Sequence, residues 1–132
     1  MNKQLLSHVG SREHIALPEF NIKDVPAKVD TGADSSSIWA SNIVERDGKL
    51  TYRLFGRGSK RYTGKSITTD NYSITKVRSS FGDSEIRYVV KMTMILGGRK
   101  TKVNFTLADR SRSRYPVLIG KKTLYRKFIV DV

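Results

Sequence analysis

Two apolar segments joined by a double glycine dominate the second half of the sequence. Residues 89–96 (VVKMTMIL) are largely apolar and β-branched, and residues 103–107 (VNFTL) alternate strictly between apolar and polar side chains. Strict alternation places every second side chain on one face, which is typical of a half-buried strand. Gly97 and Gly98 supply the turn between the two segments. The sequence therefore predicts a β-hairpin here, and with it a fold built on antiparallel strands.

Shorter segments extend the all-β pattern along the chain. Residues 85–88 lengthen the first arm of the hairpin back to a turn of small residues at 79–84 (SSFGDS). Further strands are predicted at residues 27–29, 38–40, 50–55, 66–69 and 128–132. Residues 121–126, just after Gly120, favour a short helix. No linker, repeat or low-complexity segment divides the chain, so we expect a single domain over residues 1–132: a closed, mostly antiparallel β-barrel with one short helix near the C-terminus.

The composition excludes several kinds of chemistry. The chain has no cysteine, so disulfides, thiolate zinc sites and a cysteine nucleophile are excluded together. His8 and His14 lack the spacing of a metal-binding helix motif, so we expect no metal and no cofactor. No segment approaches the ~18 apolar residues that span a membrane, and the N-terminus lacks the apolar core of a signal peptide. The expected location is cytoplasmic.

The charge of the chain restricts its partners. Twenty-five Lys and Arg residues against 12 Asp and Glu give a net charge of +13, enough to attract a polyanion. Nucleic acid, an acidic peptide and an acidic protein surface all meet that description. Residues 56–62 (GRGSKRY) form a basic segment next to aromatic side chains, which suits either a nucleic-acid contact or a solvated loop. Charge alone does not choose among these partners.

One carboxylate lies between an apolar strand and a turn of small residues. The segment VDTGADSSSIWA, residues 29–40, places Asp30 at this junction. Such a carboxylate is often only a turn former, but Asp-Thr-Gly is also half of an aspartic-protease active site. That chemistry needs two neighbouring carboxyl groups, one ionised and one protonated. Thr31 and Gly32 suit the tight turn that would present Asp30. This chain contains the motif once, so a second copy would have to supply the other Asp30.

A second apolar segment ends in a glycine before the predicted helix. Residues 114–121 read RYPVLIGK. As structure alone, this is a buried strand with a glycine kink. We also expect Ile119, Gly120 and Lys121 to pack beneath the Asp30 turn and support it.

Taken together, these elements resemble the retroviral-type aspartic proteases, the retropepsins. Those chains carry Asp-Thr-Gly-Ala-Asp, a glycine-rich flap, a glycine-containing hairpin, and an apolar-apolar-Gly-Arg segment before a short helix. The resemblance implies that residues 79–84 form a mobile flap over the cleft. It implies catalytic roles for Asp30, Thr31 and Gly32, and substrate contacts from Ala33, Asp34, Ser80, Phe81, Gly82 and Arg87. For Arg87, a surface ion pair is the alternative to a substrate contact. The same alternative applies to four more charged residues in segments that are similar to related proteins: Arg12, Glu13, Asp109 and Arg110.

The chain departs from the retropepsin pattern in three places. It has an additional stretch between Trp39 and about Val77, and its flap segment has one glycine where retropepsins have several. Lys121 replaces the arginine that pairs with the aspartate four residues after the catalytic one. The resemblance therefore implies a weaker, single-point ion pair between Lys121 and Asp34.

A closer resemblance covers nearly the whole chain. It is to retropepsin-like bacterial and archaeal proteins labelled ATP-dependent zinc proteases, through residues 9–13, 16–18, 27–33, 85–90, 107–110 and 115–120. This chain shows neither a zinc ligand set nor a phosphate loop to match that label. Members of the group are associated with ligases that add glutamates to proteins, which implies an acidic peptide substrate.

Two functions of different classes follow from the sequence. The favoured one is an aspartic endopeptidase of retropepsin type, acting as a homodimer on glutamate-rich or acidic peptide tails. The other is a non-catalytic basic β-barrel that binds RNA or an acidic protein surface. Asp30 separates them, because a binder of polyanions gains nothing from a carboxylate in its cleft.

Overall fold

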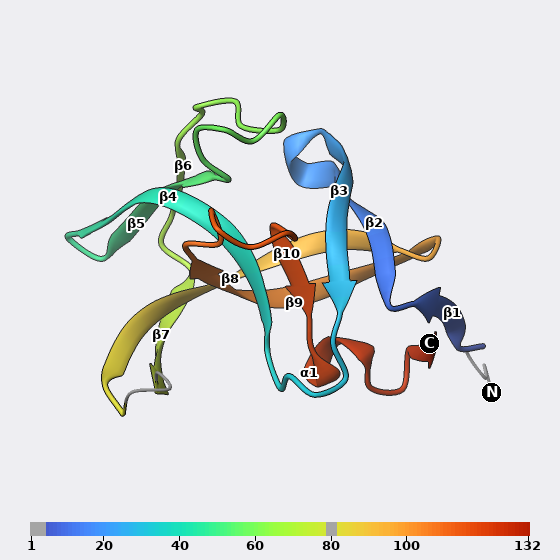
Figure 1. Ribbon diagram of the computed structural model, residues 1–132. Coiled ribbons are helices and arrows are strands. Elements are labelled where there is room, and N and C mark those ends of the chain that lie inside the picture. The colour runs from blue at the N-terminus through green and yellow to red at the C-terminus, as the bar shows by residue number, and fades with distance from the viewer. Residues whose placement is uncertain (1–4, 79–81) are drawn as a thin grey trace.

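A closed β-barrel forms the centre of the molecule in the computed structural model, which describes residues 5–78 and 82–132 (Figure 1). Among these residues, six strands close the barrel: β2 (Arg12–Leu17), β3 (Ile22–Val29), β4 (Ser36–Arg46), β8 (Ser84–Leu96), β9 (Arg99–Ala108) and β10 (Val117–Ile119). Their order around the barrel is β10-β3-β2-β8-β9-β4, and β4 pairs again with β10 to close the ring. The predicted fold class is confirmed.

The barrel is mostly antiparallel, as the sequence predicted. Parallel pairing occurs between β3 and β10 and between β4 and β9, whereas the other four barrel contacts are antiparallel. The longest hairpin joins β8 and β9 through Gly97 and Gly98, both at positive φ. Glycine adopts these angles without the steric cost that a Cβ would add. The hairpin predicted from alternation is therefore confirmed.

Alternate side chains of the barrel strands fill its interior. Met92, Met94 and Leu96 of β8 face Val103 and Phe105 of β9 within one buried cluster. Each fully buried aliphatic or aromatic side chain stabilises the fold by about 1.5–3 kcal/mol relative to exposure. This cluster holds the barrel strands, and the turns between them, in fixed positions.

Smaller elements surround the barrel. β5 (Lys49–Leu54) and β6 (Ile67–Thr69) continue the sheet beyond β4, and β7 (Tyr72–Arg78) pairs with β8. β1 (Ser7–Gly10) and β11 (Phe128–Asp131) form a separate parallel pair. A 3-10 turn, η1 (Pro18–Phe20), connects β2 to β3, and α1 (Lys121–Leu124) follows β10. The short helix and the strands near residues 50, 67 and 128 agree with the sequence prediction, whereas β1, β2 and β7 were not predicted.

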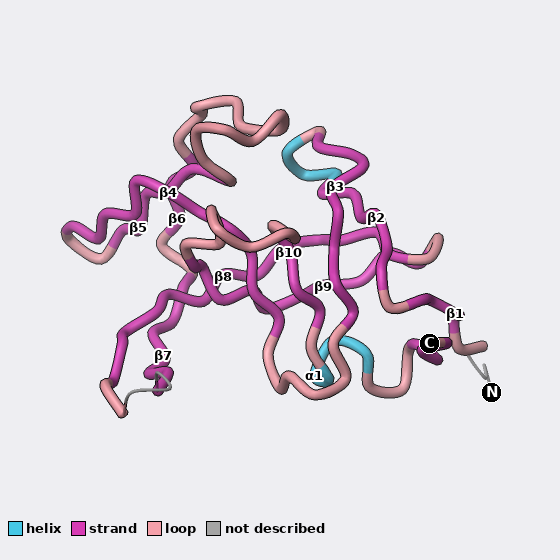
Figure 2. The backbone as a smooth tube through the Cα atoms, viewed as in Figure 1, coloured by secondary structure: helices cyan, strands magenta, loops and turns pink. Residues whose placement is uncertain are grey.

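The two ends of the barrel differ. At the lower end in Figure 1, the turn after β3 lies next to α1, and the β7–β8 hairpin extends towards the same end. At the upper end, the long connection between β5 and β6 and the η1 turn lie over the strands, as the loop tracing in Figure 2 shows. The Asp30 turn and the predicted flap hairpin therefore share one end of the molecule.

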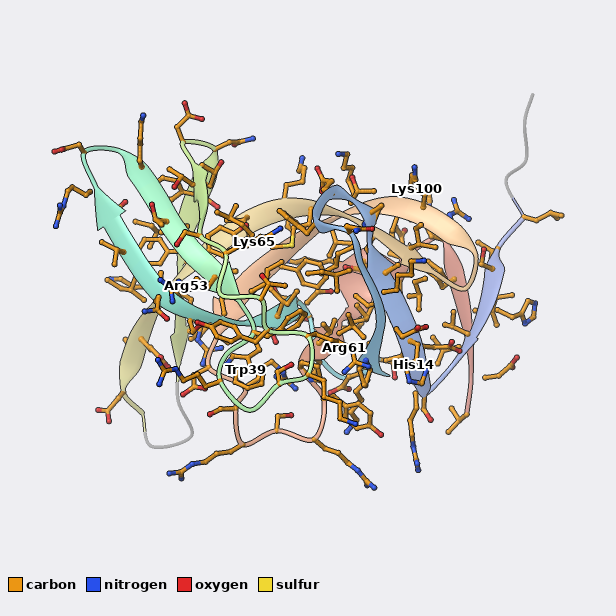
Figure 3. All side chains as sticks on the ribbon, turned by 90° about the horizontal axis from the view of Figure 1, so that it is seen from above. His14, Trp39, Arg53, Arg61, Lys65 and Lys100 are labelled. Atoms are coloured by element: carbon orange, nitrogen blue, oxygen red, sulfur yellow. The ribbon has the colours of Figure 1, made fainter. Side chains whose placement is uncertain are left out.

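The long connection, residues 55–66, packs against the barrel through Trp39. A Cβ built on Gly56 would lie 2.8 Å from the Trp39 ring, so the backbone fits there only as glycine. Arg53 of β5 donates a hydrogen bond to the Tyr62 hydroxyl (3.1 Å) and so ties the loop to the sheet. Figure 3 views this end and shows Arg53, Arg61 and Lys65 around the loop. Within the additional stretch noted in the sequence, residues 55–66 thus form a basic cap over one end of the barrel, between β5 and β6.

None of the helices in the described ranges has the length and apolar character needed to cross a membrane.

Candidate active site

Asp30 follows the last residue of β3 and is fixed by the neighbouring strand. Its backbone N–H donates to the carbonyl of Ile119 (2.9 Å), which extends the β3–β10 pairing by one residue. On the other side, the N–H of Val29 donates to the carbonyl of Ser11 (2.9 Å). The side chain of Asp30 is half-buried. Two rigid strands therefore set the position of this carboxylate.

The turn after Asp30 binds one oxygen of its carboxylate. The N–H of Gly32 donates to Asp30 Oδ1 (2.9 Å), and the N–H of Ala33 donates to the Asp30 carbonyl (3.2 Å). A Cβ on Gly32 would lie 3.2 Å from Oδ1, so a larger residue would crowd the carboxylate. Within the described residues, Oδ2 has no hydrogen-bond partner and no other carboxyl group bonds to Asp30. One oxygen is held while the other is available to a ligand.

Gly120 lies beneath the segment that follows this turn. A Cβ at Gly120 would be 2.5 Å from the Ser35 carbonyl oxygen and 2.9 Å from that of Ala33. The next two N–H groups, of Lys121 and Lys122, donate to the carbonyls of Ala33 (2.7 Å) and Asp34 (3.1 Å). The start of α1 therefore supports residues 33–35 through direct backbone contacts. Ile119, Gly120 and Lys121 thus contact residues 30 and 33–35 directly, and their supporting role in the site stays a prediction.

A buried hydroxyl pair links β4, α1 and Gly120. Ser36 Oγ lies 2.7 Å from Thr123 Oγ1, and it also accepts the N–H of Gly120 (3.0 Å). Both hydroxyl residues are buried. Because buried polar groups are costly when unpaired, this network fixes how α1 sits against the turn.

We expect Ser36→Ala to lower the free energy of unfolding by about 1–3 kcal/mol, because it leaves the Thr123 hydroxyl and the Gly120 N–H without their partner. The matched control is Ser35→Ala, since the neighbouring Ser35 side chain is exposed and should cost no more than about 0.5 kcal/mol. Urea titration of both variants measures the difference. Equal stability of the two would show that the network contributes nothing.

Lys121 of α1 and Asp34 form the ion pair that the resemblance implied. Lys121 Nζ lies 3.2 Å from Asp34 Oδ1, and both side chains are more than half exposed. The contact is single-point and solvated, so its contribution to stability is small. Thr31 and Gly32 are exposed and Ala33 is half-buried, which leaves them accessible at the mouth of the site.

The predicted flap lies at the free end of the β7–β8 hairpin. Ser79, Ser80 and Phe81 fall outside the described residues, so the substrate contacts predicted for Ser80 and Phe81 stay predictions. Gly82 is exposed and has φ +88°, a conformation that favours glycine. The described part of the hairpin extends towards the end of the barrel that carries Asp30 (Figure 1), and the flap itself stays a prediction.

Two tyrosines anchor the base of this hairpin to β4. The hydroxyls of Tyr72 and Tyr88 both donate to the carboxylate of Glu45, and their rings meet edge to face with centroids 6.0 Å apart. The hydrogen bond to Glu45 raises the pKa of Tyr72 to about 12. Partial desolvation, and then the charge of Glu45, raise the pKa of Tyr88 as well. The base of the hairpin is therefore held against β4.

Arg87 lies further along the hairpin, in a cavity of about 580 Å³ beside Trp39 and Ser111. It pairs with Glu85 (3.3 Å), the surface alternative considered for it, and the residues lining this cavity do not include Asp30. Its contact with substrate stays a prediction. Arg110 instead donates to the Tyr115 carbonyl (2.9 Å), Ser37 Oγ (3.2 Å) and Ser113 Oγ (3.0 Å). Burial, and then the charge of Arg87, lower the pKa of Arg110.

The other acidic residues of the similar stretches bind backbone groups rather than arginines. Glu13 accepts the N–H of Gly10 (2.7 Å), and Asp109 accepts the N–H of Ser111 (3.0 Å). Hydrogen bonds from Ser111, first from its side chain and then from its backbone, lower the pKa of Asp109. Residues 5–78 and 82–132 hold no group of three or more His, Asp or Glu side chains arranged to bind a metal. The residues present therefore do not fit a zinc centre.

Sequence reasoning missed the support given by Ser36 and Thr123 and the anchor formed by Glu45. A serine two residues after Asp34 carried no signal, because its importance depends on Thr123, 87 positions away. Glu45 likewise meets Tyr88 across 43 positions. Only the folded barrel brings these pairs together.

Comparisons with known proteins agree with this geometry. A family model described as "Retropepsin-like aspartic endopeptidase RimB" matches residues 8–132. Proteins named "Probable alpha-L-glutamate ligase" are similar over 93% of this chain, at 32% identity in Shewanella pealeana and 28% in Desulfotalea psychrophila. The chain spans only 28% and 27% of the length of those two relatives. A crystal structure of a Legionella pneumophila protein of unknown function superimposes with a TM-score of 0.71 at 29% identity, covering 95% of this chain and 92% of the other.

The family match spans almost the whole chain and includes the Asp30 turn, the β8–β9 hairpin and the Gly120 segment. The chain therefore belongs to the RimB-like family of retropepsin-like aspartic endopeptidases.

Proposed function

We propose that this protein is an aspartic endopeptidase that acts as a homodimer on acidic peptides, with Asp30 from each subunit forming the catalytic pair. The observation that carries the proposal is the held carboxylate of Asp30. One oxygen is bonded to Gly32 and the other is open, at a turn fixed by Ile119 and Gly120.

The reaction needs the two carboxyl groups in different protonation states. Two carboxyls held close together share one proton, because both cannot ionise easily. The ionised Asp30 takes a proton from water as the water oxygen attacks the carbonyl carbon of the scissile peptide. The protonated Asp30 of the partner subunit gives its proton to the carbonyl oxygen. As the tetrahedral intermediate collapses and its C–N bond breaks, the first Asp30 gives the proton it took from water to the departing nitrogen. The partner's Asp30 takes back a hydroxyl proton of the intermediate, so the shared proton is restored.

The outer edge of β11 offers a surface for dimerisation. β11 pairs with β1 on one side, and no strand of the described residues covers its other side. Ile129 in this strand is 39% exposed and the nearby Tyr125 is 68% exposed. An open strand edge readily pairs with another chain, and antiparallel pairing with its own copy generates two-fold symmetry. This edge lies beside α1 at the same end as the Asp30 turn (Figure 1).

Two observations favour an acidic substrate. The net charge of +13 attracts and concentrates acidic peptides at the surface. In the curated relatives, a segment similar to this chain belongs to a longer protein named for an alpha-L-glutamate ligase. A peptidase joined to such an enzyme would meet chains that contain glutamate. Acidic peptide tails are therefore the substrate class that we propose.

A mixing experiment tests both the reaction and the shared site. Wild-type protein is unfolded and refolded together with an equal amount of Asp30→Asn, and cleavage of an acidic peptide is measured. If each site needs two Asp30 side chains, about a quarter of randomly formed dimers are fully wild type, so the activity of the added wild type falls to about half. An excess of the Asp30→Asn protein should lower this activity further. Unchanged activity would show that each subunit works alone.

The alternative function is a non-catalytic barrel that binds RNA. The basic loop at residues 55–66 favours it, because Arg57, Lys60, Arg61 and Lys65 lie on an ordered cap with no acidic residue. It predicts tight, salt-sensitive RNA binding and no peptide cleavage by the wild type. Measuring both on one preparation decides between the two functions.

A further inference from the structure

A basic pocket lies on the outer face of the barrel, and its lining includes Lys28 of the strand that leads to Asp30 but not Asp30 itself. Its volume is about 550 Å³, and its lining residues are Ser11, Arg12, Lys28, Arg110, Ser113, Arg114, Tyr115 and Leu118. Four of these residues are basic and none is acidic. We call this site the basic pocket.

Strand register places the basic pocket next to the reactive carboxylate. Lys28 and Asp30 are two residues apart along the same extended chain, which puts them on the same face about 7 Å apart. Leu118 is the register partner of Lys28 and immediately precedes Ile119, whose carbonyl holds the Asp30 N–H. A side chain that enters the basic pocket therefore belongs to a peptide residue close to the bond under attack.

The basic residues are placed together without compensating charge. Arg12 lies directly opposite Lys28 across the antiparallel β2–β3 pair, and like charges in that position destabilise a sheet. Arg110 is fixed by neutral partners, through Tyr115, Ser37 and Ser113. Among the described residues, none of the pocket's four basic side chains forms an ion pair with a carboxylate. Repulsion among these positive charges is unfavourable while the pocket is empty, and an anion that binds there offsets it.

We propose that the basic pocket selects a glutamate side chain of the substrate at a position adjoining the scissile bond, an inference that rests on the proposed peptidase function. Tyr115 and Leu118 supply apolar surface for the methylene groups of the side chain. Lys28, Arg12 and Arg114 supply donors for its carboxylate, and hydrogen bonds between charged groups are stronger than neutral ones. A lysine or arginine in the same position is repelled.

The test separates binding from cleavage. Two labelled acidic peptides differ only at one central residue, glutamate or glutamine, and their affinities are measured on Asp30→Asn protein by fluorescence anisotropy. We expect the glutamate peptide to bind about tenfold more tightly, the size of one charge-assisted hydrogen bond. The double variant Lys28→Met, Arg114→Met should lose this preference. Both side chains are exposed, so the fold should tolerate the change.

The matched control is Lys91→Met, Lys100→Met, which removes the same charge from exposed lysines outside the basic pocket. It should weaken both peptides slightly and keep their ratio. If the control lost the preference for the glutamate peptide to the same extent, the basic pocket would not be the selective site. Equal affinity of the glutamate and glutamine peptides for Asp30→Asn protein with an unaltered pocket would also overturn the proposal. A phosphoserine peptide that binds better than the glutamate peptide would also contradict the proposal.

Wild-type cleavage then distinguishes the two proposals. The position of the cut is mapped by mass spectrometry. If the protein cleaves without a preference for glutamate, the peptidase function is retained and glutamate selection by the basic pocket is rejected. A glutamate preference in binding without any cleavage retains the basic pocket as a carboxylate site and rejects the peptidase.

Discussion

Replacing Asp30 with asparagine should abolish cleavage of acidic peptides while leaving the fold intact. The amide nearly matches the carboxylate in size, and its oxygen can still accept the N–H of Gly32. It cannot take a proton from water or share one with the partner subunit. General acid–base catalysis contributes on the order of 10² to 10⁴ in rate, and the substitution removes it from both halves of the pair. The measurement is kcat/KM together with a urea titration.

Asp47→Asn is the matched control, because it makes the same chemical change at an exposed turn. Asp47 has φ +53°, which asparagine also tolerates, so neither stability nor activity should change. Binding of acidic peptides to Asp30→Asn should persist and weaken as salt rises, since screening shortens the reach of surface charges. An Asp30→Asn protein that cleaves at the wild-type rate would refute the catalytic role.

Gly120→Ala should produce the largest loss of stability among single methyl additions in the site. Its Cβ would lie 2.5 Å from the Ser35 carbonyl oxygen and 2.7 Å from the carbon bonded to it, and these backbone atoms cannot rotate away. The φ of Gly120 is −98°, so the cost comes from overlap and not from backbone conformation. We expect the free energy of unfolding to fall by about 3 kcal/mol. Residues 33–35 would also shift and take the Asp30 turn with them.

Gly58→Ala is the comparison for this substitution. No atom lies within 4 Å of a Cβ at Gly58, but its φ is +99°, so the loss should be about 1 kcal/mol from conformation alone. Denaturant midpoints and peptide cleavage are measured on both variants. Activity should fall in Gly120→Ala and persist in Gly58→Ala. A stable and fully active Gly120→Ala would mean that the close approach has no role.

Local patterns predicted those parts of the fold whose causes are themselves local. The β8–β9 hairpin follows from alternation around Gly97 and Gly98, and the short helix follows from the residues after Gly120. The ion pair between Lys121 and Asp34 was also predicted, because the resemblance fixes both positions within their motifs. By contrast, β7 (Tyr72–Arg78) has no strong pattern of its own, and its strand state depends on pairing with β8.

The sequence by itself determined the all-β class, the excess of positive charge and the identity of the one Asp-Thr-Gly carboxylate. Tertiary structure decided what surrounds that carboxylate. The basic pocket draws its residues from β2, β3, β10 and the β1–β2 and β9–β10 connections. The hydroxyl pair of Ser36 and Thr123 spans 87 positions. Strand pairing around a closed barrel sets these distances, because its register fixes which side chains face each other across the sheet. A linear pattern contains the residues of such a site but not their register.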